Sequence, residues 1–143
     1  MSVGMVAKQV PGDGHDYMQE LHGSPHQRLM IAEINTAYTP ALIVLDGVEA
    51  LVSGGPESGK SVRTEVVLAA TERVAIDAVG VAVLRHWGTT PEVAEGPIFE
   101  QEQIARSVEL GLGVDGPEKI RFVTGDAESA AYASEIQEVL ARG

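Results

Sequence analysis

The chain has no cysteine among its 143 residues. This excludes disulfides, zinc ribbons, a thiol nucleophile and an iron–sulfur cluster held by the chain's own thiolates. Basic residues are scarce: 10 Lys and Arg face 21 Asp and Glu, for a formal net charge of −11. Because so acidic a surface repels phosphate backbones and anionic lipids, we expect neither nucleic acid nor a membrane as a partner.

No uninterrupted hydrophobic run is long enough to span a bilayer. The longest apolar region, residues 66–84, is broken by Glu72, Arg73 and Asp77. No basic start leading into an apolar stretch follows Met1, so a signal peptide is not expected. We therefore expect a cytoplasmic protein.

The composition is that of a globular protein, with 44% hydrophobic and 22% charged residues. The length allows one domain, which we expect to be a single α/β domain over residues 1–143. The sequence predicts an extended segment at 3–10, strands at 42–45, 66–69 and 120–123, and helices at 26–38, 72–87, 99–110 and 127–141.

The alternation of strands and helices predicts a small, mostly parallel sheet with helices packed on its faces. The aliphatic runs at 42–45 and 66–69 are typical of adjacent central strands buried on both faces. The start in extended structure and the small sheet leave two alternatives open. The chain is either a small domain with an N-terminal edge strand or the C-terminal half of a larger α/β unit.

Residues 54–61 match the spacing Gly-x4-Gly-Lys-Ser of a nucleotide phosphate loop. In such a loop backbone N–H groups cradle phosphates, the Lys reaches the terminal phosphates and the Ser ligates magnesium at a helix N-terminus. The candidate cofactor-binding residues are Gly54, Gly55, Pro56, Gly59, Lys60 and Ser61. Residues 62–70, however, predict a strand where this motif requires a helix, so a turn with a solvated Lys60 is the structural alternative.

Three histidines lie close together in the sequence, at positions 15, 22 and 26, among Asp13, Asp16 and Glu20. Neutral imidazoles and carboxylates are good ligands for divalent transition metals, although these spacings match no established motif. The predicted metal ligands are His15, His22 and Asp46. A polar loop without a ligand is the alternative interpretation.

Two carboxylates accompany apolar elements. Asp46 follows the aliphatic run at 42–45, and ligands in open α/β sheets bind beyond such strand ends. Its structural alternative is to accept backbone hydrogen bonds in the turn with Gly47. Asp77 lies on a helix expected to be buried, so it requires a partner or a function. Arg73, four residues earlier, is the expected structural partner.

Several segments together resemble the C-terminal half of the domain-of-unknown-function family 362, over residues 15–123. The resemblance rests on His22 and on residues 31–35, 42–47, 54–56, 59, 67–79 and 111–113. It implies a fragment of a longer protein without a settled activity, in which the 54–59 loop joins two strands. Many members are labelled iron–sulfur proteins, a label that a chain without cysteine cannot take. The residues that match the family pattern are His15, His22, Asp46, Gly54, Gly55, Pro56 and Asp77.

Three functions follow from these residues. The first is a small-molecule site, with or without a divalent metal, in which His15, His22, Asp46 and Asp77 are the candidate catalytic residues. The second is a non-catalytic module whose exposed apolar edge joins a missing half or a second copy of the chain. The third is magnesium-nucleotide binding through residues 54–61.

Overall fold

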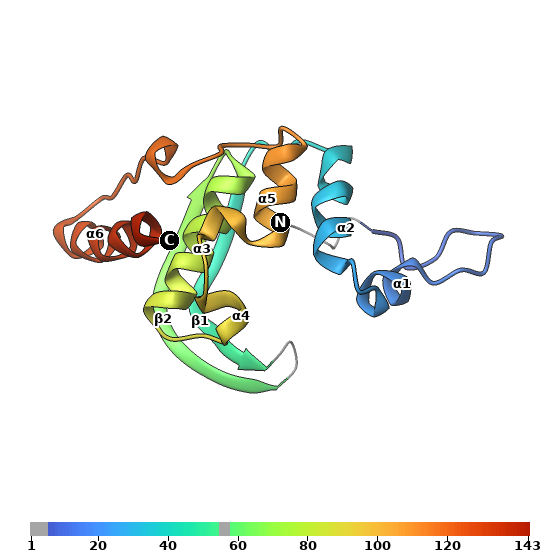
Figure 1. Cartoon of the computed structure of the whole chain (residues 1–143), viewed down its shortest axis with the longest axis horizontal. Coiled ribbons are helices and arrows are strands. Elements are labelled where there is room, and N and C mark those ends of the chain that lie inside the picture. Colours follow the sequence, from blue (N-terminus) through green and yellow to red (C-terminus); the bar gives the residue numbers. More distant parts are fainter. Residues whose placement is uncertain (1–5, 55–57) are drawn as a thin grey trace.

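A long antiparallel β-hairpin forms the centre of the fold (Figure 1). The structure is a computed structural model that describes residues 6–54 and 58–143. Strand β1 spans Ile43–Gly54 and strand β2 spans Gly59–Ala70. Their register runs from Ile43 opposite Ala70 to Gly54 opposite Gly59. The chain is thus an α/β protein whose sheet, in the described residues, has two strands.

Two irregularities interrupt the hairpin. Thr64 and Glu65 of β2 together lie opposite Val48 of β1, and Val52 is an extra residue in β1. Glu65 has a φ of 52°, the left-handed conformation that non-glycine residues rarely adopt. Bulges of this kind bend and twist a strand, which agrees with the curved hairpin in Figure 1.

Helices cover one face of the hairpin and extend to both sides of it (Figure 1). Helix α3 packs against both strands, α6 packs on α3, and α5 packs against α3 and α2. The α-helices are α1 Tyr17–Gly23, α2 Gln27–Ile34, α3 Arg73–His86, α4 Pro91–Ala94, α5 Glu102–Glu109 and α6 Ala127–Arg142. The 3-10 turns are η1 Asn35–Ala37, η2 Ile98–Glu100 and η3 Pro117–Lys119. In residues 6–54 and 58–143, no helix has the length and hydrophobicity needed to cross a membrane.

Carboxylate side chains cap the N-termini of the two longest helices, α3 and α6. The Glu72 carboxylate accepts hydrogen bonds from the backbone N–H groups of Val74, at 2.9 Å, and Ala75, at 2.5 Å. Asp126 caps α6 by accepting a 2.8 Å bond from the Ser129 N–H, and this bond lowers the pKa of Asp126. Each carboxylate satisfies N–H groups that a helix start leaves without an intrahelical partner.

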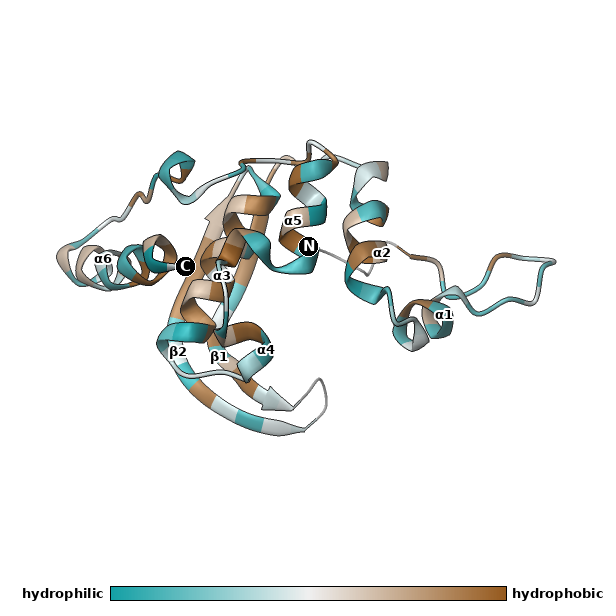
Figure 2. Cartoon of the chain, in the orientation of Figure 1, coloured by the Kyte–Doolittle hydropathy of each residue, from teal (hydrophilic) through white to brown (hydrophobic). Residues whose placement is uncertain are grey.

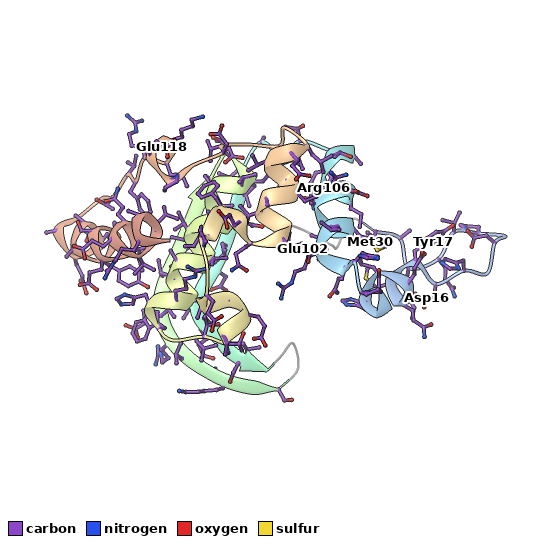
Figure 3. All side chains as sticks on the ribbon, viewed as in Figure 1. Asp16, Tyr17, Met30, Glu102, Arg106 and Glu118 are labelled. Atoms are coloured by element: carbon purple, nitrogen blue, oxygen red, sulfur yellow. The ribbon has the colours of Figure 1, made fainter. Side chains whose placement is uncertain are left out.

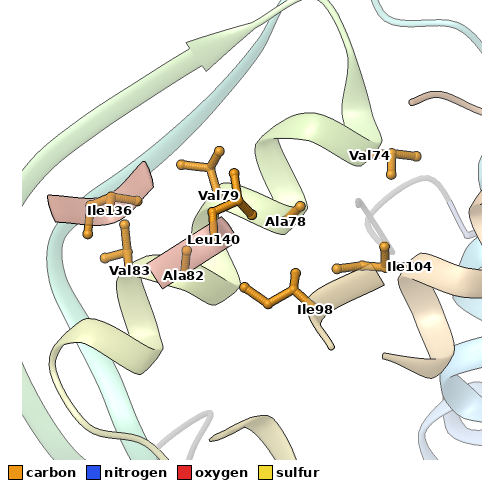
Figure 4. Close-up of a cluster of buried hydrophobic side chains, with 9 residues drawn as sticks. All are labelled: Val74, Ala78, Val79, Ala82, Val83, Ile98, Ile104, Ile136 and Leu140. Atoms are coloured by element: carbon orange, nitrogen blue, oxygen red, sulfur yellow. The ribbon is translucent and has the colours of Figure 1, made fainter. Parts of the chain in front are cut away.

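The core forms around α3 (Figure 4). Five α3 residues contribute to it: Val74, Ala78, Val79, Ala82 and Val83. The other members are Ile98, Ile104 of α5, and Ile136 and Leu140 of α6. A Cβ at Gly80 would lie 3.2 Å from Cδ1 of Leu45, so the absence of a side chain there lets α3 approach β1 closely. Figure 2 shows that the part of the hairpin beside α3 is largely hydrophobic.

The prediction of a mostly parallel sheet is wrong. Only four residues separate the paired Gly54 and Gly59, whereas a parallel pair needs a crossover of about a dozen residues. The expected burial on both faces is also wrong, because Val44 is 60% exposed and Val67 is 62% exposed. Residues 53, 54 and 59–61 belong to the strands: β1 continues to Gly54, and β2 begins at Gly59.

Two expected extended segments are not strands. Residues 120–123 lie outside the sheet, and residues 6–10 have no strand structure; residues 3–5 lie outside the described part of the chain. A strand needs a neighbour for its backbone hydrogen bonds, and no described strand pairs with either segment. The four predicted helices are confirmed with shifted ends, except that 26–38 and 99–110 each include a 3-10 turn. Glu72 is the N-cap of α3.

We predict that Glu65→Gly stabilises the protein by up to about 1 kcal/mol, because glycine adopts the left-handed conformation without steric cost. The matched control is Glu49→Gly in β1, where φ is not positive, which should instead destabilise by about 0.5–1 kcal/mol. Urea denaturation of both variants checks the opposite signs. Equal losses of stability would show that the Glu65 backbone carries no strain.

Candidate functional site

A cleft of about 450 Å³ lies between the hairpin and the helices that cover it. Its walls come from β1, from residues 77–84 of α3 and from residues 101–104 at the start of α5. Arg28 of α2 also contributes. The volume falls within the range of about 300–1,000 Å³ that is usual for small-molecule sites. Apolar side chains from three elements and a few charged groups therefore share one concave surface.

Two of the predicted site residues, Asp46 and Asp77, line this cleft. Asp46 lies on β1 and accepts a 3.0 Å hydrogen bond from the Val48 N–H, which is the turn-like interaction expected of it. Asp77 lies on α3, and its Oδ2 accepts a 3.2 Å bond from Nε2 of Gln103. Carboxylates distant in the sequence are thus brought to two walls of one cleft.

Arg73, the expected structural partner of Asp77, donates hydrogen bonds to backbone carbonyls that follow α2. One of its guanidinium nitrogens donates to the carbonyl oxygen of Asn35, and the other terminal nitrogen donates to that of Tyr38 at 2.8 Å. The guanidinium carbon also lies 5.5 Å from the Tyr38 ring centroid. Arg73 therefore fastens the segment after α2 to the start of α3.

The histidines form a separate group at α1. Nε2 of His15 lies 2.8 Å from Oε2 of Glu20, and Nδ1 of His22 lies 3.1 Å from Nε2 of Gln27. The Tyr17 hydroxyl donates to Asp13 at 2.7 Å, which lowers the pKa of Asp13 and raises that of Tyr17.

Helix α1 projects from one end of the molecule, well apart from the hairpin; Tyr17 and Asp16 mark its start in Figure 3. The structure does not bring His15 or His22 to Asp46. Among the residues it describes, no three His, Asp or Glu side chains form a group that could hold a metal ion.

The phosphate-loop residues belong to the hairpin. Lys60 and Ser61 lie in β2, and Gly55 and Pro56 lie outside the described residues. The glycines are explained by the tight end of the hairpin: Gly54 has a φ of 73°, and a Cβ at Gly59 would clash with the carbonyl oxygen of Ser53. Because β2 follows the loop, no helix N-terminus is present to hold phosphates as this motif requires.

Several cleft residues were not predicted: Arg28, Glu49, Glu102 and Gln103. Glu49 lies on β1, and the packing of α2 on α5 and of α5 on α3 brings the other three to the same cleft. That packing includes an ion pair between Arg106 of α5 and Glu33 of α2, at 2.7 Å; Arg106 and Glu102 are labelled in Figure 3. No local pattern in the sequence marks these residues.

Comparison with known proteins agrees with the resemblance found in the sequence. The family model "Domain of unknown function (DUF362)" matches residues 1–82, from the N-terminal segment into α3. This range differs from the expected 15–123 and does not identify the chain as the C-terminal half of the family. No curated protein and no solved structure matches the chain. The match covers more than half of the sequence, and the chain therefore belongs to the DUF362 family.

Proposed function

We propose that this chain binds a small molecule in the cleft between β1, α3 and α5, with Asp46 and Asp77 as its polar anchors. The observation that supports the proposal is the convergence of these two carboxylates, one from a strand and one from a helix, on one cavity of about 450 Å³. Ligand sites are commonly apolar clefts with a few placed polar groups, which is the character of this one.

The chemistry of the cleft favours a ligand with hydrogen-bond donors and an apolar part. Ionised carboxylates only accept hydrogen bonds, so Asp46 and Asp77 suit hydroxyl or amine groups. Val81, Val83 and Leu84 of α3 provide apolar wall. The proposal includes neither the histidines nor a metal ion, because α1 lies apart from the cleft.

A screen of small molecules by thermal shift tests this proposal. Molecules that raise the Tm are titrated against Asp46→Asn and Asp77→Asn, which keep the side-chain shape and remove the charge. We expect a loss of affinity of roughly tenfold, because a hydrogen bond to a charged group contributes about 1.5–3 kcal/mol.

Asp115→Asn is the matched control, since Asp115 pairs with Lys119 outside the cleft. Its affinity for the same molecules should equal that of the wild type. A screen without hits, or hits that bind both cleft variants as tightly as the wild type, would contradict the proposal.

A second function, self-association, is favoured by the uncovered face of the hairpin. Leu42, Val44 and Val67 are each about 60% exposed, and the pairing of Val44 with Ala69 and of Asp46 with Val67 places them side by side. Two-stranded hairpins are marginally stable unless their apolar surface is covered. We infer that this face docks against a second copy of the chain.

The charge of the face supports a second copy as its occupant. Apart from Asp46, whose carboxylate accepts from the Val48 N–H and lines the cleft, these two cross-strand pairs carry no charge, although the chain carries a net charge of −11. Two copies can therefore meet here with little of the repulsion that their other surfaces impose. In a twofold dimer each copy uses the same patch, so a single interface would cover the exposed hairpin face of both copies.

We predict that sedimentation velocity shows a concentration-dependent dimer that Val67→Lys converts to a monomer, because the interface would have to bury the new charge. Val10→Lys, an equally apolar exposed position on the N-terminal segment, should leave the dimer unchanged. A wild-type protein that remains monomeric up to about 100 µM, well above typical specific affinities, would exclude this function.

A further inference from the structure

A second cavity, of about 360 Å³, lies beside the end of β2. We call it the edge groove. One wall is residues 67–70 of β2, and the other is residues 119–123, which lie at the end of η3 and beyond it. Ala75, Ile76 and Val79 of α3 give it an apolar base. No residue lines both this groove and the cleft at β1, so the two sites are separate.

The β2 wall of the edge groove is an open strand edge. Because successive side chains of a strand alternate between its faces, a cavity that contacts four consecutive residues lies at the edge of that strand. Strand β1 pairs with the other edge of β2, and no further strand of the described residues pairs with β2. An unpaired edge presents backbone N–H and C=O groups that can bind another extended chain.

The opposite wall is extended but belongs to no sheet. Ile120 has a φ of −96° and a ψ of 119°, which are extended values. Ile120 and Phe122 are half-buried against the core, whereas Arg121 and Val123 are exposed, and this two-residue alternation is that of a strand. Within the described part of the chain, residues 121–123 form no backbone–backbone hydrogen bond. This wall therefore has apolar side chains toward the core and Arg121 at the rim.

Arg121 sets the charge that a partner should carry. It forms no ion pair with any residue that the structure describes, whereas Lys119 is paired with Asp115. Glu72, the one carboxylate among the described residues of the groove, caps α3. Residues 67–70 carry no charge. In a chain with a net charge of −11, the edge groove thus offers a cation, and its complement is an acidic side chain.

We propose that the edge groove binds an extended peptide segment of another protein, which adds to the open edge of β2 as a third strand. The backbone of the segment forms hydrogen bonds with β2, as in other cases of strand addition. Its apolar side chains face α3 and alternate with acidic side chains, one of which pairs with Arg121. Val67 also belongs to the exposed hairpin face, but an added strand continues the sheet beyond β2 and leaves that face open.

The test is isothermal titration of the whole chain with two peptides, acetyl-VEVEV-amide and acetyl-VKVKV-amide. We expect saturable binding of the acidic peptide, at least about fivefold tighter than that of the basic one. The net charge of −11 by itself favours the basic peptide, so this order of affinities requires a local cation. An acidic peptide that does not bind saturably, or that binds no more tightly than the basic one, would overturn the proposal.

A third peptide tests the backbone hydrogen bonds. It is the acidic peptide with every backbone N–H methylated, so it keeps the side chains and cannot donate to β2. We expect no saturable binding of this peptide. Binding as tight as that of the unmethylated peptide would show that no strand is added.

Substitutions assign the charge. Arg121→Glu should reverse the preference, so that the basic peptide binds more tightly. Arg63→Glu is the matched control, because Arg63 is an exposed arginine of β2 that does not line the edge groove; it should keep the wild-type preference. Circular dichroism checks that both variants are folded. An unchanged preference in Arg121→Glu, or the same reversal in Arg63→Glu, would overturn the assignment.

Hydrogen–deuterium exchange locates the bound peptide. With saturating acidic peptide, the amides of residues 67–70 should exchange more slowly, because N–H groups on the open edge gain acceptors. The amides of α1, which lies apart from the hairpin, should exchange as before. Saturable binding without slower exchange at residues 67–70 would place the peptide elsewhere and overturn the proposal.

Discussion

The packing of α3 on the inner face of the hairpin is the contact on which the remaining structure depends. A two-stranded sheet has too little hydrophobic surface to be stable alone, and α3 supplies the missing layer. Val74, Ala78 and Ala82 are fully buried, and Gly80 permits the close approach to Leu45. Helix α6 is attached through Ile136 and Leu140 and α5 through Ile104, so α4, α5 and α6 all pack on this helix.

One-sided cover has consequences for function. Because helices pack on a single face, the opposite face keeps Val44 and Val67 in solvent, and within residues 6–54 and 58–143 no further strand pairs with β1 or β2. The cleft is bounded on one side by α3 and on the other by β1. Asp77 lies on its α3 wall, so the helix at the centre of the core also carries a polar group of the proposed site.

Local sequence signals predicted the helices well: the expected helix at 127–141 is α6, and the one expected at 72–87 is α3. The sheet was predicted wrongly because an aliphatic run such as 42–45 does not reveal which face is covered. The predicted grouping of the histidines with Asp46 rested on a different signal. Their closeness in sequence says nothing about distance to Asp46, which the placement of α1 at the end of the molecule determines.

Arg73 and Arg85 lie at opposite ends of α3, where the helix dipole affects a cation in opposite ways. Both guanidinium groups donate to backbone carbonyls. Arg85 lies in the last turn of α3, where the negative end of the helix dipole favours a cation. Arg73 is the first residue of the same helix, where the dipole disfavours a cation and burial adds to the cost. The neighbouring Glu72 is committed to the N–H groups of Val74 and Ala75, so the carbonyl oxygens of Asn35 and Tyr38 that accept from Arg73 offset part of this cost and fix the segment after α2 to the start of α3.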